Sequence, residues 1–208
     1  MDSATGMVPT RKTGSERLTY AGAPVGPALG DFWAWSVSDL TEHRTRSALA
    51  EFIVAAGLGV ATDGVRAPAA GSVLATTDGV RVAVRSAAYV QAWRPGRESR
   101  IAFDMPRTHA WDPDTGHSPG VRAEPDVHVF AVLAHAEPAT IDPLNADQWV
   151  FYVVPAALLR ARAGALHTIA LPALEAMTAP VGFAELASAV LAALPPSGLG
   201  GRRSGPHG

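Results

Sequence analysis

The chain has 208 residues, a formal net charge of −2 and 48% apolar residues, which fits one globular domain and argues against a strongly basic polyanion binder. It contains no cysteine, so disulfides, cysteine-based metal sites and thiol nucleophiles are excluded. The longest apolar run, Ala48 to Ala61, is too short to span a membrane and contains Glu51. Because the first thirty residues also lack an apolar signal core, we expect a cytoplasmic protein without a membrane partner.

Composition divides the chain into three parts. Residues 1–29 are rich in Gly, Pro, Ser and Thr, and residues 195–208 have the same character, so a disordered arm and a disordered tail are predicted. Residues 30–194 are predicted to fold as a single domain. Lys12 is the only lysine, so a mechanism that needs a lysine inside this domain is excluded.

Two helices are predicted at the start of the domain. Asp31 can cap a short helix whose apolar surface comes from Phe32, Trp33 and Trp35. A longer helix is expected from about residues 41–44 to Leu58. The i, i+3, i+4, i+7 spacing of four apolar residues predicts its buried face, which would consist of Leu49, Phe52, Ile53 and Ala56.

The period then changes to two, which indicates strands. A weak strand at 73–75 and a turn at Asp78-Gly79 precede residues 80–85, where valines alternate with Arg81, Ala83 and Arg85. A strand over 100–105 is expected to pair back onto this one through the turn at 94–96.

The remaining pattern completes an α/β or α+β domain. Residues 106–125 contain many prolines and glycines and predict a long loop. Residues 127–134 and 150–154 are nearly continuous apolar runs, as in strands whose sheet is covered on both faces. Helices are predicted after Pro155 to about Arg162 and over 183–194. The order of elements indicates a three-layer domain in which helices and a sheet pack against one another.

Several stretches together resemble one large family. They are Ala50-Glu51-Phe52-Ile53-Val54, Asp78-Gly79-Val80-Arg81-Val82, Ser86-Ala87-Ala88-Tyr89-Val90-Gln91-Ala92-Trp93, Trp111-Asp112-Pro113, Asp126-Val127-His128-Val129-Phe130 and Asp147-Gln148-Trp149-Val150-Phe151-Tyr152-Val153-Val154-Pro155. With these motifs the chain resembles the PD-(D/E)xK, or restriction-endonuclease-like, nuclease superfamily, in a bacterial branch of it. The resemblance covers most of residues 31–194. It implies a three-layer α/β core, with a mixed central sheet flanked by helices.

The resemblance also implies where a catalytic site would lie, and there the chain departs from the family. The superfamily holds Mg²⁺ with an Asp on a hairpin strand and the acidic residue of E-x-K on the next strand. This chain has Ala83-Val84-Arg85 at that position, and residues 68–76 contain no carboxylate. Only Glu51, on the first long helix, keeps the residue type of the family. Glu51 and Arg85 are thus predicted remnants of a degenerate site, with no resident metal.

Other carboxylates and histidines are weaker candidates. Asp63 and Asp78 could serve a migrated Mg²⁺ site, although Asp-Gly turns explain both. Asp112 and Asp114 begin a calcium-loop-like pattern that lacks the acidic twelfth position. His109 and His117 flank that loop, and exposed histidines are the preferred interpretation. His128 and His135 bracket a predicted strand and are interpreted as satisfied or edge histidines that cannot share one ion.

Basic and aromatic residues gather after the central strand. This candidate nucleic-acid surface consists of Arg81, Arg94, Arg97 and Arg100 with Tyr89, Gln91 and Trp93; Arg85, Arg107 and Phe103 lie in the same region.

Three functions remain open. The leading hypothesis is a catalytically degenerate nuclease-like domain that acts as a DNA-binding or scaffolding module. The alternatives are an active, divergent Mg²⁺-dependent DNA endonuclease, or a module that binds a partner protein or forms a homodimer without nucleic acid. Because a carboxylate beside buried residues needs a partner, a Glu51–Arg85 ion pair is predicted in the former catalytic pocket.

Overall fold

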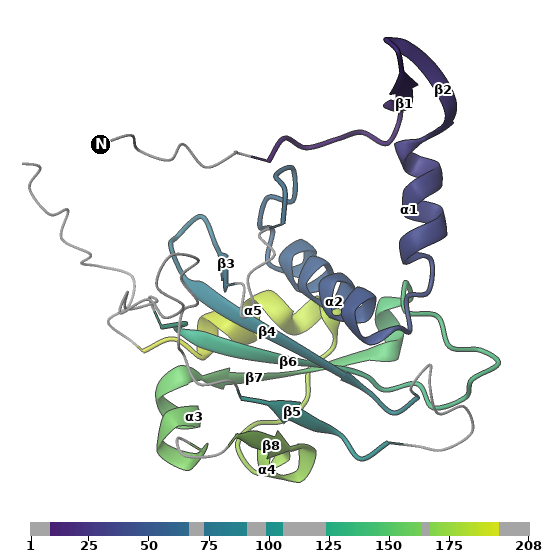
Figure 1. Ribbon diagram of the computed structural model, residues 1–208. Coiled ribbons are helices and arrows are strands. Elements are labelled where there is room, and N and C mark those ends of the chain that lie inside the picture. Colours follow the sequence, from purple (N-terminus) through teal and green to yellow (C-terminus); the bar gives the residue numbers. More distant parts are fainter. Residues whose placement is uncertain (1–8, 67–72, 91–98, 106–123, 164–166, 196–208) are drawn as a thin grey trace, which may run out of the picture.

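A computed structural model describes residues 9–66, 73–90, 99–105, 124–163 and 167–195. Its centre is a mixed four-stranded sheet in the order β3-β4-β6-β7 (Figure 1). The strands are β3 (Val73–Ala75), β4 (Arg81–Ala88), β6 (Val127–Leu133) and β7 (Trp149–Pro155). β4 runs parallel to β6, whereas β3 and β7 run antiparallel to their neighbours. The protein is thus a mixed α/β fold, as the sequence predicts.

The sequence explains why these strands form the interior of the sheet. β6 and β7 are nearly continuous apolar runs, and both faces of each strand are largely buried. The turn before β4 needs a left-handed residue, which Gly79 supplies at φ 79°, and the Gly79 amide donates to the Thr76 carbonyl at 2.9 Å. The predicted hairpin at Asp78-Gly79 is therefore confirmed.

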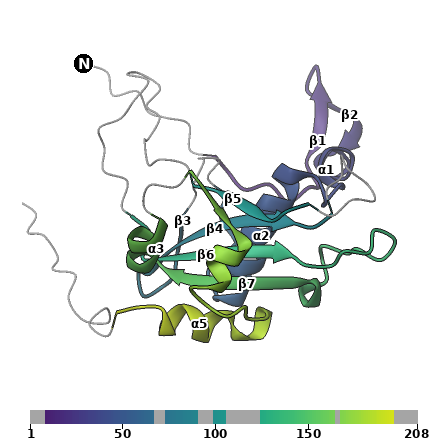
Figure 2. The same ribbon diagram turned by 90° about the horizontal axis from the view of Figure 1, so that it is seen from below.

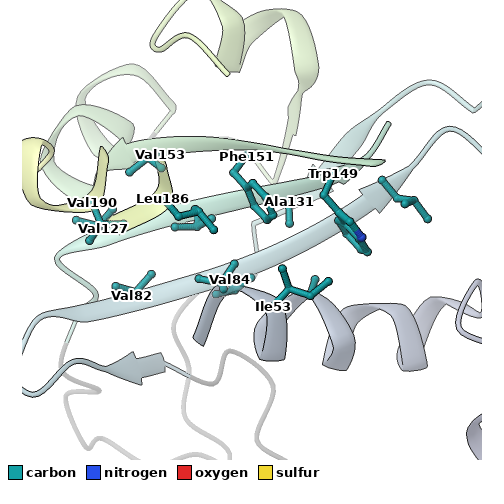
Figure 3. Packing of buried hydrophobic residues seen from close by; sticks show 14 of the residues in the cluster. Ile53, Val82, Val84, Val127, Ala131, Trp149, Phe151, Val153, Leu186 and Val190 are labelled. Atoms are coloured by element: carbon teal, nitrogen blue, oxygen red, sulfur yellow. The ribbon is translucent and has the colours of Figure 1, made fainter. Parts of the chain in front are cut away.

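One face of the sheet is covered by α2 (His43–Gly57) and α5 (Leu186–Ala192), the latter preceded by a 3₁₀ turn at Phe183–Glu185. Figure 3 shows Val82 and Val84 of β4 on this face, opposite Ile53 of α2. Glu42 is the N-cap of α2, and its carboxylate accepts hydrogen bonds from the backbone amides of Arg44 at 2.7 Å and Thr45 at 2.9 Å. We call this apolar cluster the α2-side core.

The opposite face carries a second apolar cluster, the α3-side core. It is covered by α3 (Ala156–Ala163), α4 (Leu171–Glu175) and a small antiparallel sheet of β5 (Ala102–Asp104) and β8 (Thr168–Ala170), which lie on this side of the main sheet in Figure 1. Helices and strands therefore lie on both sides of the main sheet. A 3₁₀ turn at Ala146–Gln148 leads into β7, where the Trp149 indole donates to the Pro143 carbonyl at 3.0 Å.

The N-terminal region differs from the prediction of a disordered arm over residues 1–29. β1 (Arg17–Tyr20) and β2 (Ala23–Ala28) form an antiparallel hairpin, followed directly by α1 (Leu29–Val37). The helix begins earlier than predicted, with Ala28 at the N-cap, and Asp31 lies in its first turn, where its carboxylate accepts a hydrogen bond from the Ala28 amide at 2.7 Å. Residues 1–8, and residues 196–208 of the predicted tail, lie outside the described part of the chain.

Two further predictions are corrected. Of the predicted buried face of α2, Ile53 is buried and Leu49 is partly buried, whereas Phe52 and Ala56 are exposed and Ala50 and Val54 are buried in their place. Ala50, Ile53 and Val54 belong to the α2-side core, so the buried face of the helix is rotated from the predicted one. β5 pairs with β8 rather than with β4, so it belongs to the layer that covers the α3-side core.

Candidate functional site

Strand β4 places positions 83 and 85 on the face that carries the α3-side core. Successive side chains of a strand point to opposite faces, and Val82 and Val84 face α2, so Ala83 and Arg85 face away from it. Ala83 pairs with His128 of the parallel strand β6, and Arg85 pairs with Phe130. Arg85 and His128 therefore lie on neighbouring strands on one face.

These two side chains present polar atoms without hydrogen-bond partners. Nε of Arg85 and Nδ1 of His128 are buried, and neither makes a hydrogen bond to any described residue. Burial lowers the pKa of Arg85, which nevertheless remains a permanent cation. Burial, together with the positive charges of Arg85 and Arg160, lowers the pKa of His128 to about 4. At neutral pH the pair is therefore a guanidinium cation beside a neutral imidazole.

Charged groups from three other elements surround this pair. Arg160 of α3 forms an ion pair with Glu124, and both act on His128. Asp104 at the end of β5 attracts Arg85 and partly offsets the effect of burial on its pKa. The site, defined here as Arg85 and His128 with Arg160 at its edge, thus contains two permanent cations, and carboxylates lie beside it.

This set of groups does not fit a divalent cation. Ala83 offers no ligand, and Arg85 is a positive charge where a metal would need an oxygen donor. Among the described residues, no three His, Asp or Glu side chains are grouped as metal ligands. Asp63 and Asp78, the two alternative carboxylates, lie in exposed turns.

The predicted ion pair between Glu51 and Arg85 is wrong. Glu51 binds Arg66 instead, through Nε at 2.7 Å and a second guanidinium nitrogen at 2.8 Å. The reason is geometric: Glu51 belongs to α2, whereas Arg85 leaves β4 on the other face of the sheet. Because the side chain of Arg66 is 48% exposed, the pair is expected to stabilise the fold by at most about 1 kcal/mol.

The candidate nucleic-acid residues have different surroundings. Arg81 is engaged by Asp126, whose carboxylate accepts its backbone amide at 2.8 Å and a guanidinium nitrogen at 3.2 Å. Arg100 is exposed and Tyr89 is half-buried. Gln91, Trp93, Arg94 and Arg97 lie outside the described residues, as do Arg107, His109, Asp112, Asp114 and His117.

Sequence reasoning missed part of this site. His128 was expected to be satisfied or at an edge, yet its Nδ1 is buried without a partner. Asp104 and Arg160 carry no motif, and only the folding of β5 and α3 over the sheet brings their charges near β4 and β6. His135 lies beyond β6, with its Nε2 at 2.7 Å from the Thr140 hydroxyl, and takes no part.

Comparison with known proteins gives no relative for this chain. No family model, no curated protein and no solved structure matches it. Within the described ranges, no helix has the length and apolar character required to cross a membrane.

Proposed function

We propose that this protein is a DNA-binding domain with a restriction-endonuclease-like core, in which a cationic phosphate-binding site replaces metal-dependent catalysis. The observation that supports it most directly is that Arg85 of β4 and His128 of the neighbouring strand β6 lie on the same face of the sheet, the face that carries positions 83 and 85. In the family that the sequence resembles, these two positions of the strand hold the acidic residue and the lysine. The mixed sheet with helices on both faces is compatible with such a core.

The chemistry of the pair suits a phosphate group. A guanidinium offers several N–H donors in one plane and can contact two phosphate oxygens at once. A neutral imidazole adds one further donor. A buried Nε that makes no hydrogen bond lowers the stability of the fold. An anion that accepts a hydrogen bond from Arg85 would remove this free-energy cost.

The sequence that follows β4 could extend the contact along a nucleic-acid backbone. The Ser99 amide donates to the Tyr89 carbonyl at 2.8 Å, so the ends of the stretch between them meet beside β4. That stretch contains Arg94 and Arg97, and exposed Arg100 follows it. Phosphate contacts of this kind supply affinity and position without reading sequence.

We expect fluorescence anisotropy to show binding to labelled duplex DNA that weakens steeply as salt rises, because bound cations release counterions from the phosphates. Arg85→Met should weaken binding about 10-fold or more, since a lost hydrogen bond to a charged group typically costs about 1.5–3 kcal/mol. Arg44→Met is the matched control, because Arg44 is exposed at the start of α2, away from the site. Reversing the charges of Arg94, Arg97 and Arg100 together should weaken binding to all sequences alike.

The same anisotropy titrations are repeated with labelled single-stranded DNA, and both kinds of DNA are titrated with and without Mg²⁺. Equal affinity of wild type and Arg85→Met, with both proteins folded by circular dichroism, would contradict the assignment of the site. Absence of binding even at low salt would instead favour the protein-interaction function.

We also expect no cleavage of DNA in the presence of Mg²⁺ or Mn²⁺. Arg85 is a cation, Ala83 has no ligand, and residues 68–76 contain no carboxylate, so a metal would lack oxygen donors. Joint replacement by Ala83→Glu and Arg85→Lys should not create activity, because the hairpin Asp is still missing. Gel assays of supercoiled and linear DNA measure this. Metal-dependent cleavage by wild type that disappears in Glu51→Gln would establish the active-endonuclease alternative.

A further inference from the structure

The N-terminal arm, defined here as residues 9–37, exposes an unusual amount of apolar surface. It comprises β1, β2 and α1 and projects from the body beyond α2 in both views (Figures 1 and 2). Helix α1 has no buried residue, and Trp35 is 83% exposed. Among the described residues, thirteen large apolar side chains are exposed, and seven belong to this arm: Leu18, Tyr20, Val25, Phe32, Trp33, Trp35 and Val37.

The arm is internally ordered even though little of it contacts the body. The Leu29 amide donates to the Glu16 carbonyl at 2.7 Å, and the Gly30 amide donates to the Gly14 carbonyl at 2.8 Å. These hydrogen bonds join the start of α1 to the segment that precedes β1. Gly14 adopts φ 92°, and a Cβ there would lie 2.9 Å from the Trp33 ring, so this close approach requires glycine. Toward the body, Arg11 donates to the Asp63 carbonyl at 3.1 Å.

A hollow of about 720 Å³ lies between the hairpin and α1. Its apolar lining includes Leu18 of β1 and the side chains of Leu29, Phe32 and Trp35, which recur every three residues and so form one stripe of the helix. Two cations, Lys12 and Arg17, and two carboxylates, Glu16 and Asp31, also line it. The hollow therefore has a mostly apolar lining, and its four charged side chains, called the rim below, carry no net charge.

We propose that this arm is a homodimer interface, and that the hollow receives the arm of a second copy of the chain. A two-fold contact places the same patch on itself, so the patch must carry both a projection and a recess. Trp35 lies at one wall of the hollow with 83% of its surface exposed and supplies the projection, and the hollow supplies the recess, so the same arm carries both. The balanced rim suits a second copy, because a two-fold axis can set cations of one arm opposite carboxylates of the other. A strongly charged partner would gain nothing from such a rim.

The exposed area is also of the size that a dimer needs. Aromatic residues bury about 150–250 Å² each, so the exposed parts of Tyr20, Phe32, Trp33 and Trp35 come to roughly 500 Å². The three exposed aliphatic side chains bring the exposed apolar area of the whole arm toward the ~800 Å² that each partner contributes to a standard interface. This inference is independent of DNA binding, because the arm contains none of the residues of the Arg85–His128 site.

Sedimentation equilibrium of the full chain over about 1–300 μM, with light scattering after gel filtration, tests the proposal. We expect a concentration-dependent dimer of wild type and a dissociation constant at least about 10-fold weaker in Trp35→Ser, as for a central aromatic anchor. Phe52→Ser is the matched control, because Phe52 is 55% exposed on α2 and should leave the dimer unchanged.

A double charge reversal provides a second test that leaves the apolar surface intact. Lys12→Glu with Arg17→Glu gives the rim four carboxylates in each copy and should weaken the dimer most strongly at low salt. A wild-type chain that stays monomeric throughout the concentration range would overturn the proposal and indicate a different occupant for the hollow. A dimer that persists in Trp35→Ser and dissociates in Phe52→Ser would overturn it as well.

Discussion

Replacing Phe130 by alanine is expected to lower the free energy of unfolding by about 3–5 kcal/mol, the usual range for a large aromatic residue lost from a close-packed core. Phe130 is fully buried in the middle of β6, paired with Arg85 on one side and Tyr152 on the other. Its ring meets Phe103 of β5 edge to face, with the ring centres 5.0 Å apart. The substitution would thus loosen both the sheet and the layer above it.

Urea unfolding followed by circular dichroism and tryptophan fluorescence measures this loss. Phe52→Ala is the control, since Phe52 is 55% exposed and its truncation should change stability by no more than about 0.5 kcal/mol. The Phe130 ring also stacks near His128, with centroids 6.1 Å apart, so the variant should disturb the candidate site as well. A loss below about 1 kcal/mol would show that β5 does not pack against the sheet as described.

The strands of the central sheet could be predicted because their pattern has one simple physical cause. A sheet buried on both faces needs apolar side chains at nearly every position, and residues 127–134 and 150–154 supply them everywhere except at His128. The β3–β4 hairpin was likewise predictable from Asp78-Gly79, where glycine meets the need for a positive φ. β8 and α4 were missed because three- and five-residue elements are too short to show a period.

Helix α2 shows where periodicity fails. Its bounds were predicted closely, but its buried face was not, because apolar residues occur around much of its circumference between Ala48 and Ala56. The choice between Phe52 and Ala50 depends on how closely the helix can approach the sheet, which favours the smaller side chain. The helix also buries Arg46, which is 1% exposed and donates to the Thr41 carbonyl at 2.9 Å, and no apolar pattern predicts a buried cation.

The sequence predicted where on the strand the residues of the candidate site lie, but it did not predict which side chains lie next to Arg85. Alternation along β4 placed Ala83 and Arg85 on one face, as observed. Which of the two faces α2 would cover is a property of the three-dimensional packing, and the wrong choice produced the mistaken pairing of Arg85 with Glu51. The neighbour that Arg85 does have, His128, follows from the parallel register of β4 and β6, which the sequence alone does not contain.

That neighbour gives the second large expected effect. The pKa of His128 is about 4 in the folded protein, against about 6.5 for an exposed histidine, because burial and the charges of Arg85 and Arg160 oppose protonation more than Glu124 favours it. Between pH 6.5 and 4, His128 is therefore protonated in the unfolded chain but mostly neutral in the folded protein. Stability from this group is complete above pH 6.5, falls as the pH decreases toward 4, and is constant below that. The total loss is up to about 3 kcal/mol.

Urea unfolding at intervals between pH 7.5 and 4 isolates this contribution as the difference between wild type and His128→Leu, because carboxylates titrate alike in both. Arg85→Met should reduce the pH dependence by removing one of the charges that lower the pKa of His128, whereas Arg44→Met should leave it unchanged. Bound phosphate or DNA should raise the pKa of His128, since an anion beside the imidazole favours its protonated form. Superimposable pH profiles of wild type and His128→Leu would show that His128 is accessible to protons in the folded protein.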